Sequence, residues 1–248
     1  MVRPVTQLSV NINKVALLRN SRGRDFPSVT AFARHCLALG ARGITLHPRP
    51  DQRHARYSDV TALREVVAEF PGTELNVEGN PTREFLDVVR AARPHQCTLV
   101  PDAPGQLTSD HGWDLRREAG PLRAVLGELR AVGIRSSVFI DHDSPDIAVA
   151  RELGADRVEL YTEPYAADYG TPRRHDVRES FRRAAQSAGA AGLGVNAGHD
   201  LNLANLAYFL EIPGILEVSI GHALVVESLE EGLAAVIASY LDLIRAAP

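Results

Sequence analysis

Cysteine is scarce in this chain of 248 residues, and long hydrophobic runs are absent. Two cysteines, Cys36 and Cys97, are too few for a disulfide framework, and we expect both to be buried, reduced thiols. No stretch approaches the roughly 18 apolar residues that a membrane-spanning helix needs. The first residues also lack the apolar core and cleavage site of a signal peptide. These absences predict a cytoplasmic protein with no membrane partner.

The chain also lacks a surplus of positive charge and the short signatures of common cofactor sites. Its net charge of −4 argues against a nucleic-acid partner. It contains no GxGxxG or GKS/T phosphate loop, no HExxH or CxxC metal pattern and no GxSxG nucleophile elbow. We therefore expect no cofactor and no metal, with the chemistry carried out by side chains. Arginines and backbone N–H groups can still bind small anionic substrates locally.

Eight short β-type segments alternate with segments in which apolar residues recur at helical spacing. Such alternation over this length predicts one domain, residues 1–248, folded as a (β/α)₈ TIM barrel with additional helices. The expected strands, read as apolar runs covered on both faces, are Leu8–Asn13, Gly43–Arg49, Glu74–Gly79, Gln96–Pro101, Arg135–Asp141, Arg157–Thr162, Gly192–His199 and Leu216–His222.

An open doubly wound sheet is the alternative architecture, but it usually carries a Gly-rich first turn that is missing here. The last helix is expected over roughly Leu224–Ala247, where it closes the ring. Two connections are unusually long, Asn13–Ser28 and Asp102–Asp114. Long loops at the C-terminal face of a barrel are candidates for lids or binding loops.

Polar residues suited to acid–base or ligand chemistry stand at or near the ends of several predicted strands. The C-terminal ends of barrel strands meet at one mouth, so these residues predict a single active site. They are Asn11, Asn13, His47, Glu78, Glu159, His199 and His222.

The segment after the second predicted strand combines His47 with Arg49 and His54. Arginine makes planar contacts to phosphate, and a neutral histidine is a plausible general base near neutral pH. Burial of Glu78 would raise its pKa and make it useful as a proton shuttle. The same proton-shuttle role is predicted for Glu159. A structural role, in which Glu159 pairs with a neighbouring group inside the barrel, is equally consistent with the sequence.

Two Gly-His pairs close the seventh and eighth predicted strands, Gly198–His199 and Gly221–His222. In barrels, the loops after these strands often hold a phosphate through backbone N–H groups. The pair of motifs therefore predicts a phosphate pocket with a proton carrier beside it.

Taken together, these motifs resemble the pyridoxine 5′-phosphate synthase family. The matching stretches follow the family order and cover nearly the whole chain: SVNINKVALLRNSRG, GITLHPRPDQRH, LNVEGN, LVPDAPGQLTSDHGWD, SVFIDHD, VELYTEPYAAD, VNAGHDL and VSIGHAL. The resemblance implies a (β/α)₈ barrel with extra helices that assembles as a homo-octamer. It also implies condensation of 3-amino-2-oxopropyl phosphate with 1-deoxy-D-xylulose 5-phosphate, giving pyridoxine 5′-phosphate, phosphate and water.

The same resemblance assigns roles to individual positions. His47 and Glu78 match proton acceptors, His199 matches a proton donor, and Glu159 matches a residue that stabilises a transition state. Positions matching the amino-ketone phosphate site are Asn11, Arg22, Asp200, Gly221 and His222. Positions matching the deoxyxylulose phosphate site are Asn13, Lys14, Arg49, His54 and Thr108. The loop of Thr108 corresponds to the lid, and Arg22 to an arginine that can reach a neighbouring subunit.

Four positions depart from the commonest family pattern: Asn13–Lys14 replaces Asp-His, Asp200 a glycine, Ser219 an asparagine and Tyr161 a histidine. A carboxylate near a phosphate repels it unless Asp200 points away or pairs with Lys14. Two other functions stay open from the residues alone. One is a phosphosugar isomerase or epimerase, and the other is a barrel that binds phosphorylated metabolites without catalysis.

Overall fold

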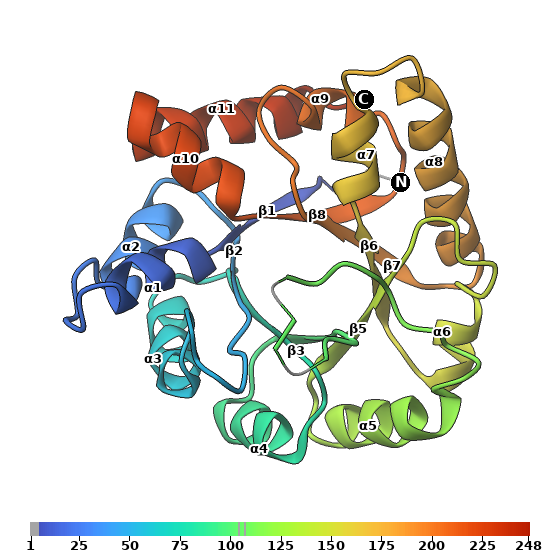
Figure 1. The fold of residues 1–248 in the computed structure, drawn as a ribbon, viewed down its shortest axis with the longest axis horizontal. Helices are drawn as coiled ribbons and strands as arrows, with labels where there is room; N and C mark the ends of the chain where they lie inside the picture. The colour runs from blue at the N-terminus through green and yellow to red at the C-terminus, as the bar shows by residue number, and fades with distance from the viewer. Residues whose placement is uncertain (1–4, 104, 107) are drawn as a thin grey trace.

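A closed barrel of eight parallel strands forms the centre of the computed structural model, which describes residues 5–103, 105–106 and 108–248. Each strand pairs with the next along the chain, and β8 pairs with β1 to complete the ring (Figure 1). This confirms the predicted (β/α)₈ barrel. The strands are β1 Gln7–Asn11, β2 Gly43–Leu46, β3 Glu74–Gly79, β4 Gln96–Leu99, β5 Arg135–Ile140, β6 Arg157–Tyr161, β7 Gly194–Gly198 and β8 Ile215–Ile220.

Helices surround the ring of strands on its outer side (Figure 1). They are α1 Asn13–Asn20, α2 Val29–Ala38, α3 Tyr57–Ala68, α4 Arg83–Ala92, α5 Ala119–Ala131, α6 Val149–Leu153, α7 Glu163–Asp168, α8 Arg174–Ala190, α9 Leu206–Phe209, α10 His222–Glu231 and α11 Leu233–Ala246. In the part of the chain that the structure describes, no helix has the length and apolar content needed to span a membrane.

Several predicted boundaries were wrong. The connection predicted over Asn13–Ser28 contains helix α1, so the first strand ends at Asn11 rather than at Asn13. The final helix is two helices, because Gly232 adopts a positive φ of 86° that an α-helix does not accommodate. The second strand and the fourth to eighth strands are also shorter than predicted, which leaves His47 and His199 in loops and His222 at a helix start.

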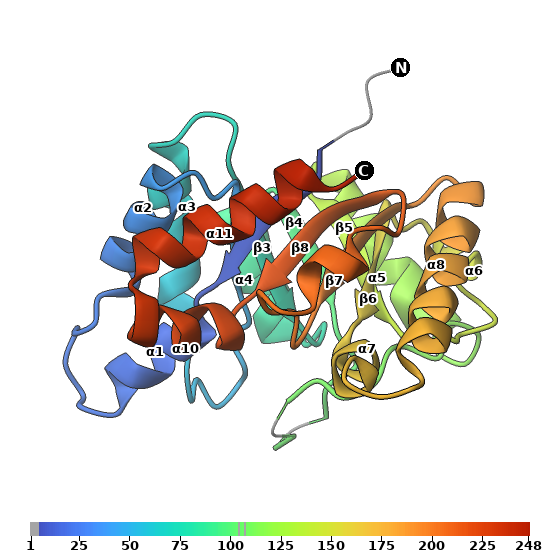
Figure 2. The same cartoon turned by 90° about the horizontal axis from the view of Figure 1, so that it is seen from above.

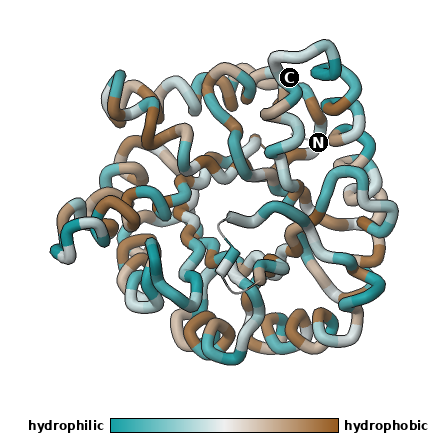
Figure 3. Tube along the Cα trace, in the orientation of Figure 1, coloured by the Kyte–Doolittle hydropathy of each residue, from teal (hydrophilic) through white to brown (hydrophobic). Residues whose placement is uncertain are grey.

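The hydrophobic core lies between the barrel and the helices. One alternating set of strand residues belongs to the same buried apolar cluster as the helix side chains. Figure 3 shows hydrophobic segments all around the ring. The strand members of the cluster are Leu8, Val10, Ile44, Leu46, Leu75, Val77, Cys97, Leu99, Val138, Ile140, Val158, Leu160, Val195, Ala197, Ile215, Val218 and Ile220. Both cysteines are free and buried, as predicted.

The other alternating set lines the inside of the barrel and is mostly polar. Barrel interiors are usually filled by bulky branched side chains. The strands are predicted to be apolar along their length, so the polar lining corrects that prediction. Ser9 and Thr45 share a hydrogen bond of 2.7 Å, and Thr98 donates to Asn76 over 3.0 Å. Buried polar members of this set are Ser9, Thr45, Asn76, Glu78, Gln96, Thr98, Ser137, Glu159, Asn196, Glu217 and Ser219.

Ion pairs occupy the N-terminal end of the barrel. Arg135, the first residue of β5, donates to Glu74, the first residue of β3, over 3.0 Å. Arg157, the first residue of β6, donates to Asn196 over 3.0 Å and lies 3.8 Å from the carboxylate of Glu217. These contacts join strands across the interior and fill the N-terminal end of the barrel. A cavity is therefore expected at the C-terminal end.

The substitution Gly112→Ala is expected to destabilise the fold. Gly112 packs so tightly on the end of β5 that an added Cβ would overlap the backbone of Ile140 and Asp141. Overpacking against backbone costs about 1–3 kcal/mol, which urea unfolding would measure. Gly120→Ala is the matched control, because a Cβ there meets nothing within 4 Å. A Gly112→Ala variant as stable as the control would contradict this packing.

Candidate active site

A cavity of about 450 Å³ opens among the C-terminal ends of the strands. This volume is in the usual range for small-molecule sites. Of the predicted site residues, all but Arg22 line it: Asn11, Asn13, Lys14, His47, Arg49, His54, Glu78, Thr108, Glu159, His199, Asp200, Gly221 and His222. The cavity therefore brings thirteen of the predicted site residues together, and Arg22 lies outside its lining.

His47 stands directly after β2 and is only 5% exposed. Its backbone N–H donates to the side-chain oxygen of Asn13 over 2.9 Å, which holds the start of α1 against it. Its two ring nitrogens face carboxyl groups, with Nδ1 4.0 Å from Glu78 and Nε2 3.7 Å from Asp102. Burial, with Arg49 and other nearby cationic groups, lowers the pKa of His47 well below its ordinary value. Near neutral pH this imidazole is therefore neutral and able to accept a proton.

Glu78 and Glu159 bring two buried carboxyl groups to the floor of the cavity. Burial, with the nearby Glu217 and Asp102, raises the pKa of Glu78 to about 8. Burial, with Glu78 and Glu217, raises the pKa of Glu159 well above its ordinary value. Gly198 allows this arrangement, because a Cβ there would lie 2.6 Å from a carboxyl oxygen of Glu159. Both carboxyl groups are thus mainly protonated near neutral pH.

His199 follows β7 in a strained backbone conformation. Its φ is 87° and that of Asp200 is 59°, values that residues other than glycine rarely adopt. Thr162 stabilises the turn by donating to the carbonyl oxygen of Gly198 over 2.7 Å. The imidazole packs on two rings, with centroids 5.1 Å from Phe139 and 5.3 Å from Tyr161. Burial lowers the pKa of His199, and the nearby Asp200 opposes that effect.

Two helices begin at the wall of the cavity. Helix α1 begins at Asn13, and α10 begins at His222 directly after Gly221. Neither N-cap residue has a side chain that caps the first turn, and in α1 the N–H of Asn13 donates to the side-chain oxygen of Asn11 over 3.0 Å, which leaves the following N–H groups for a ligand. Unpaired N–H groups at a helix start favour anions. The two helix starts therefore provide two places for anionic groups in one cavity.

Helix α1 is fixed in place by a buried ion pair. Arg19 is 2% exposed and contacts Asp59 of α3 over 2.6 Å, while also donating to the carbonyl oxygen of His54. This holds Asn13 and Lys14 beside the loop that carries Arg49 and His54. Burial and the nearby Arg49 lower the pKa of His54 to about 4, so this imidazole is neutral near neutral pH.

Asp102 is a functional candidate that the predicted set does not contain. It lies three residues after β4, is 7% exposed, and contacts Arg49 over 2.5 Å. The signal is present in the sequence, because LVPD is one more apolar run that ends in an acid. Glu217 is a second omission, since it stands inside β8 and not at its end. Burial raises the pKa of Glu217 to about 7 against the opposing effect of Arg157.

The positions that depart from the family pattern lie at or beside the cavity. Asp200 is exposed at the rim, and among the described residues it forms no ion pair with Lys14. Tyr161 supports the His199 ring, and Ser219 contributes to the cavity wall. Within the described ranges, no group of three or more His, Cys, Asp or Glu side chains is placed to hold a metal ion.

Comparison with known sequences gives a consistent result. A model of the pyridoxal phosphate biosynthesis protein PdxJ family matches residues 8–246. Pyridoxine 5′-phosphate synthase of Xanthomonas oryzae pv. oryzae (strain PXO99A) is 52% identical over 248 residues, with 97% of each chain covered. The protein of that name from Albidiferax ferrireducens is 50% identical, covering 95% of this chain and 96% of the relative.

Solved structures share the fold at low sequence identity. A structure named KGPDC from Streptococcus mutans has a TM-score of 0.64 at 9% identity, with 98% of this chain and 99% of that chain covered. The BexX/CysO complex of Amycolatopsis orientalis gives 0.63 at 17% identity, with 98% and 91% covered. At these identities the likeness concerns the barrel alone.

Proposed function

Since this chain belongs to the pyridoxal phosphate biosynthesis protein PdxJ family and acts in vitamin B6 biosynthesis, we propose how its cavity carries out the ring-closing step. The reaction condenses 3-amino-2-oxopropyl phosphate with 1-deoxy-D-xylulose 5-phosphate, giving pyridoxine 5′-phosphate, phosphate and water. The observation that carries the proposal is two helix starts at the wall of a cavity that also holds two imidazoles and two carboxyl groups. Two phosphorylated substrates need both anion sites, and the condensation needs several proton carriers.

Each helix start binds one phosphate. The start of α10, with Gly221, His222 and Asn11, takes the amino-ketone phosphate. The start of α1, with Lys14 and the neighbouring Arg49, takes the deoxyxylulose phosphate. Binding at both ends orients the amine of one substrate toward the ketone of the other. Thr108, on the loop after β4, belongs to the lid that separates the intermediates from bulk water.

The protonation states of the buried side chains decide which of them accept and which donate protons. The amine adds to the ketone and water leaves, after which proton removal at carbon drives the loss of phosphate. His47 accepts protons as a neutral imidazole, and Glu78 accepts them once it has ionised. His199 is the donor, because an anionic substrate beside it opposes the lowering of its pKa. Glu159 stabilises a transition state by hydrogen bonding, because its carboxyl group keeps its proton. Water addition and ring closure complete the sequence.

The test supplies both substrates to the purified protein. The expected result is simultaneous release of inorganic phosphate and growth of a pyridine ultraviolet band. A phosphosugar isomerase would give neither signal, and a barrel that only binds would give a thermal shift alone. Either of these outcomes would overturn the proposed reaction.

We also place the protein in the cytoplasm as a homo-oligomer, and an octamer is the expected size. Five exposed apolar side chains on or beside α1 and α10 support an interface: Leu17, Leu18, Phe26, Val226 and Leu229. The two helices contact each other and lie on one side of the barrel (Figure 1). Exposed apolar patches often mark association surfaces.

Arg22 is expected to act in the site of a neighbouring subunit, because it is exposed beside this patch and does not line its own cavity. An Arg22→Ala protein and a His47→Asn protein should each be nearly inactive. Mixing them under conditions of subunit exchange should restore part of the activity, because some sites then combine an intact His47 with an intact Arg22. Activity that stays absent in the mixture, with exchange verified by mass, would contradict a shared site.

A further inference from the structure

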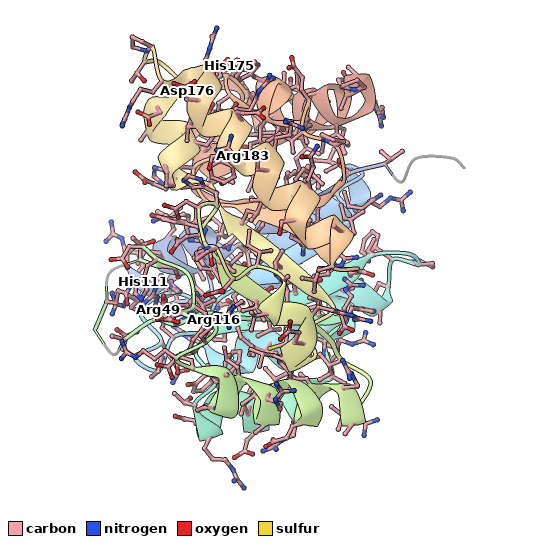
Figure 4. All side chains as sticks on the ribbon, turned by 90° about the vertical axis from the view of Figure 1, so that its right-hand side faces the viewer. Arg49, His111, Arg116, His175, Asp176 and Arg183 are labelled. Carbon is pink, nitrogen blue, oxygen red and sulfur yellow. The ribbon has the colours of Figure 1, made fainter. Side chains whose placement is uncertain are left out.

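The loop after β4 is folded against the cavity and fastened to the loop after β2. Arg49 donates to the carbonyl oxygen of Gln106 over 2.7 Å, and Ser109 lines the cavity with Thr108. In Figure 2 this loop projects from the lower side of the barrel, and α11 lies on the upper side. Figure 4 labels Arg49 and His111 at one end of the molecule, well apart from His175 and Asp176. Positions 104 and 107 of the predicted lid lie outside the described residues.

One buried carboxylate holds this arrangement together. A single oxygen of Asp102, Oδ2, lies 2.5 Å from Arg49, accepts a hydrogen bond of 2.9 Å from Ser109, and lies 3.7 Å from Nε2 of His47. The other oxygen, Oδ1, is buried and has no hydrogen-bond partner among the described residues. Asp102 itself does not line the cavity. Asp102 therefore contacts Ser109 of the loop after β4 and Arg49, and it lies beside His47. Its other oxygen can accept a further hydrogen bond.

We propose that Asp102 is the positioning residue that orients His47 and stabilises its charged form. Ser109 and Arg49 hold the Asp102 carboxylate 3.7 Å from the imidazole. That carboxylate stabilises the imidazolium formed when His47 takes a proton from the substrate. This assignment rests on the proposed function and adds a residue that contacts neither substrate.

The role of Asp102 can be measured through the pH dependence of kcat, because Asp102 belongs to the charged surroundings of His47. Charged or titratable groups face it from β2 and the loop after it, from β3, from the loop after β4 and from the end of β7. They are Arg49, His54, Glu78, Asp102 and His199. Arg49, His54 and His199 all disfavour the imidazolium. Asp102 also raises the pKa of Glu78. Asp102→Asn would therefore lower the pKa of Glu78 and leave Arg49 less opposed beside His47, so the acid limb of kcat would move to lower pH.

The experiment compares the wild-type protein with Asp102→Asn in the two-substrate assay between pH 5 and 9. We expect kcat to fall roughly tenfold or more, since small misplacements of reacting groups are costly. The acid limb of the kcat profile should move down by about one pH unit. Asp102→Glu restores a carboxylate and should recover most of kcat and the original limb. Asp143→Asn, in the loop after β5, removes an exposed carboxylate that does not line the cavity, and it should change neither quantity.

The outcomes distinguish a failure of the proposed function from a failure of the positioning role of Asp102. Product formation by the wild-type protein keeps the proposed function, and its absence ends both proposals together. A wild-type rate and an unmoved limb in Asp102→Asn overturn the positioning role alone. A lower kcat with an unmoved limb, not recovered by Asp102→Glu, also overturns it, because that pattern describes a purely structural contact. If Asp102→Asn does not fold, Asp102→Glu still tests the role: a kcat as low as that of His47→Asn would overturn it.

Discussion

His47→Asn is expected to lower kcat by roughly 10²-fold or more, the usual effect of removing an acid–base group. Asparagine retains a polar side chain of similar reach but cannot take up a proton. The rest of the site should be retained, because the contact that fixes this position is the backbone N–H of His47 donating to Asn13. Steady-state kinetics with both substrates would measure the loss, and His199→Ala is expected to give a loss of similar size.

The matched control for this substitution is His35→Asn. His35 is exposed on α2, outside the residues that line the cavity. Its variant should keep the wild-type rate within about twofold, as expected for surface changes away from a site. A His47→Asn protein that turns over as fast as His35→Asn would remove the base from the proposed mechanism.

Glu78→Gln is expected to lose activity and gain stability. Glutamine resembles the protonated carboxyl group but cannot ionise, so turnover should fall roughly 10²-fold or more. In the wild-type protein, kcat/KM should rise with pH through the pKa of about 8, because Glu78 accepts a proton only in its ionised form. A wild-type profile that falls through this range would contradict the acceptor role.

The gain in stability follows from the direction of the same pKa shift. The folded protein keeps the proton of Glu78 up to about pH 8, whereas the unfolded chain releases it near its ordinary pKa of 4.5. The free energy of unfolding therefore falls as pH rises between these values. Glu78→Gln avoids this loss and should exceed the wild type by about 3–5 kcal/mol above pH 8, with little difference below pH 4.5.

Urea unfolding at several pH values would test this linkage. Glu84→Gln is the matched control, since Glu84 is exposed on α4. It should change the free energy of unfolding little at any pH. A Glu78→Gln variant that is less stable than the wild type above pH 8 would show that ionisation of Glu78 does not destabilise the folded protein.

The sequence predicts the barrel and the rim of its cavity because both follow from local patterns. Alternating strand and helix segments predict the ring, and a polar residue after an apolar run marks the mouth, as His47 does after GITL. Boundaries are less predictable, since Asn13 could extend a strand but instead begins α1. Helix packing decides this, through the buried contact between Arg19 and Asp59.

The polar interior is harder to foresee, and it explains the omissions. In ELNVEG, Asn76 and Glu78 alternate with apolar residues, but a period of two does not say which face turns inward until the barrel closes. Glu217 occupies the same inner face of β8 in ILEVSI. For Asp102, the apolar run in LVPD marks the position, but its partners Arg49 and Ser109 come from two loops that meet only in the tertiary structure.

A crystal structure of the protein with pyridoxine 5′-phosphate bound would test the central claim most directly. The account predicts that the phosphate of the product lies on an uncapped helix start, at Gly221 and His222. The pyridine ring should then lie within hydrogen-bonding reach of His47, Glu78 and His199. A product bound elsewhere would contradict it, for example in the surface hollow lined by Tyr169, Arg174 and Tyr208. So would a product in the cavity with its ring out of reach of all three side chains.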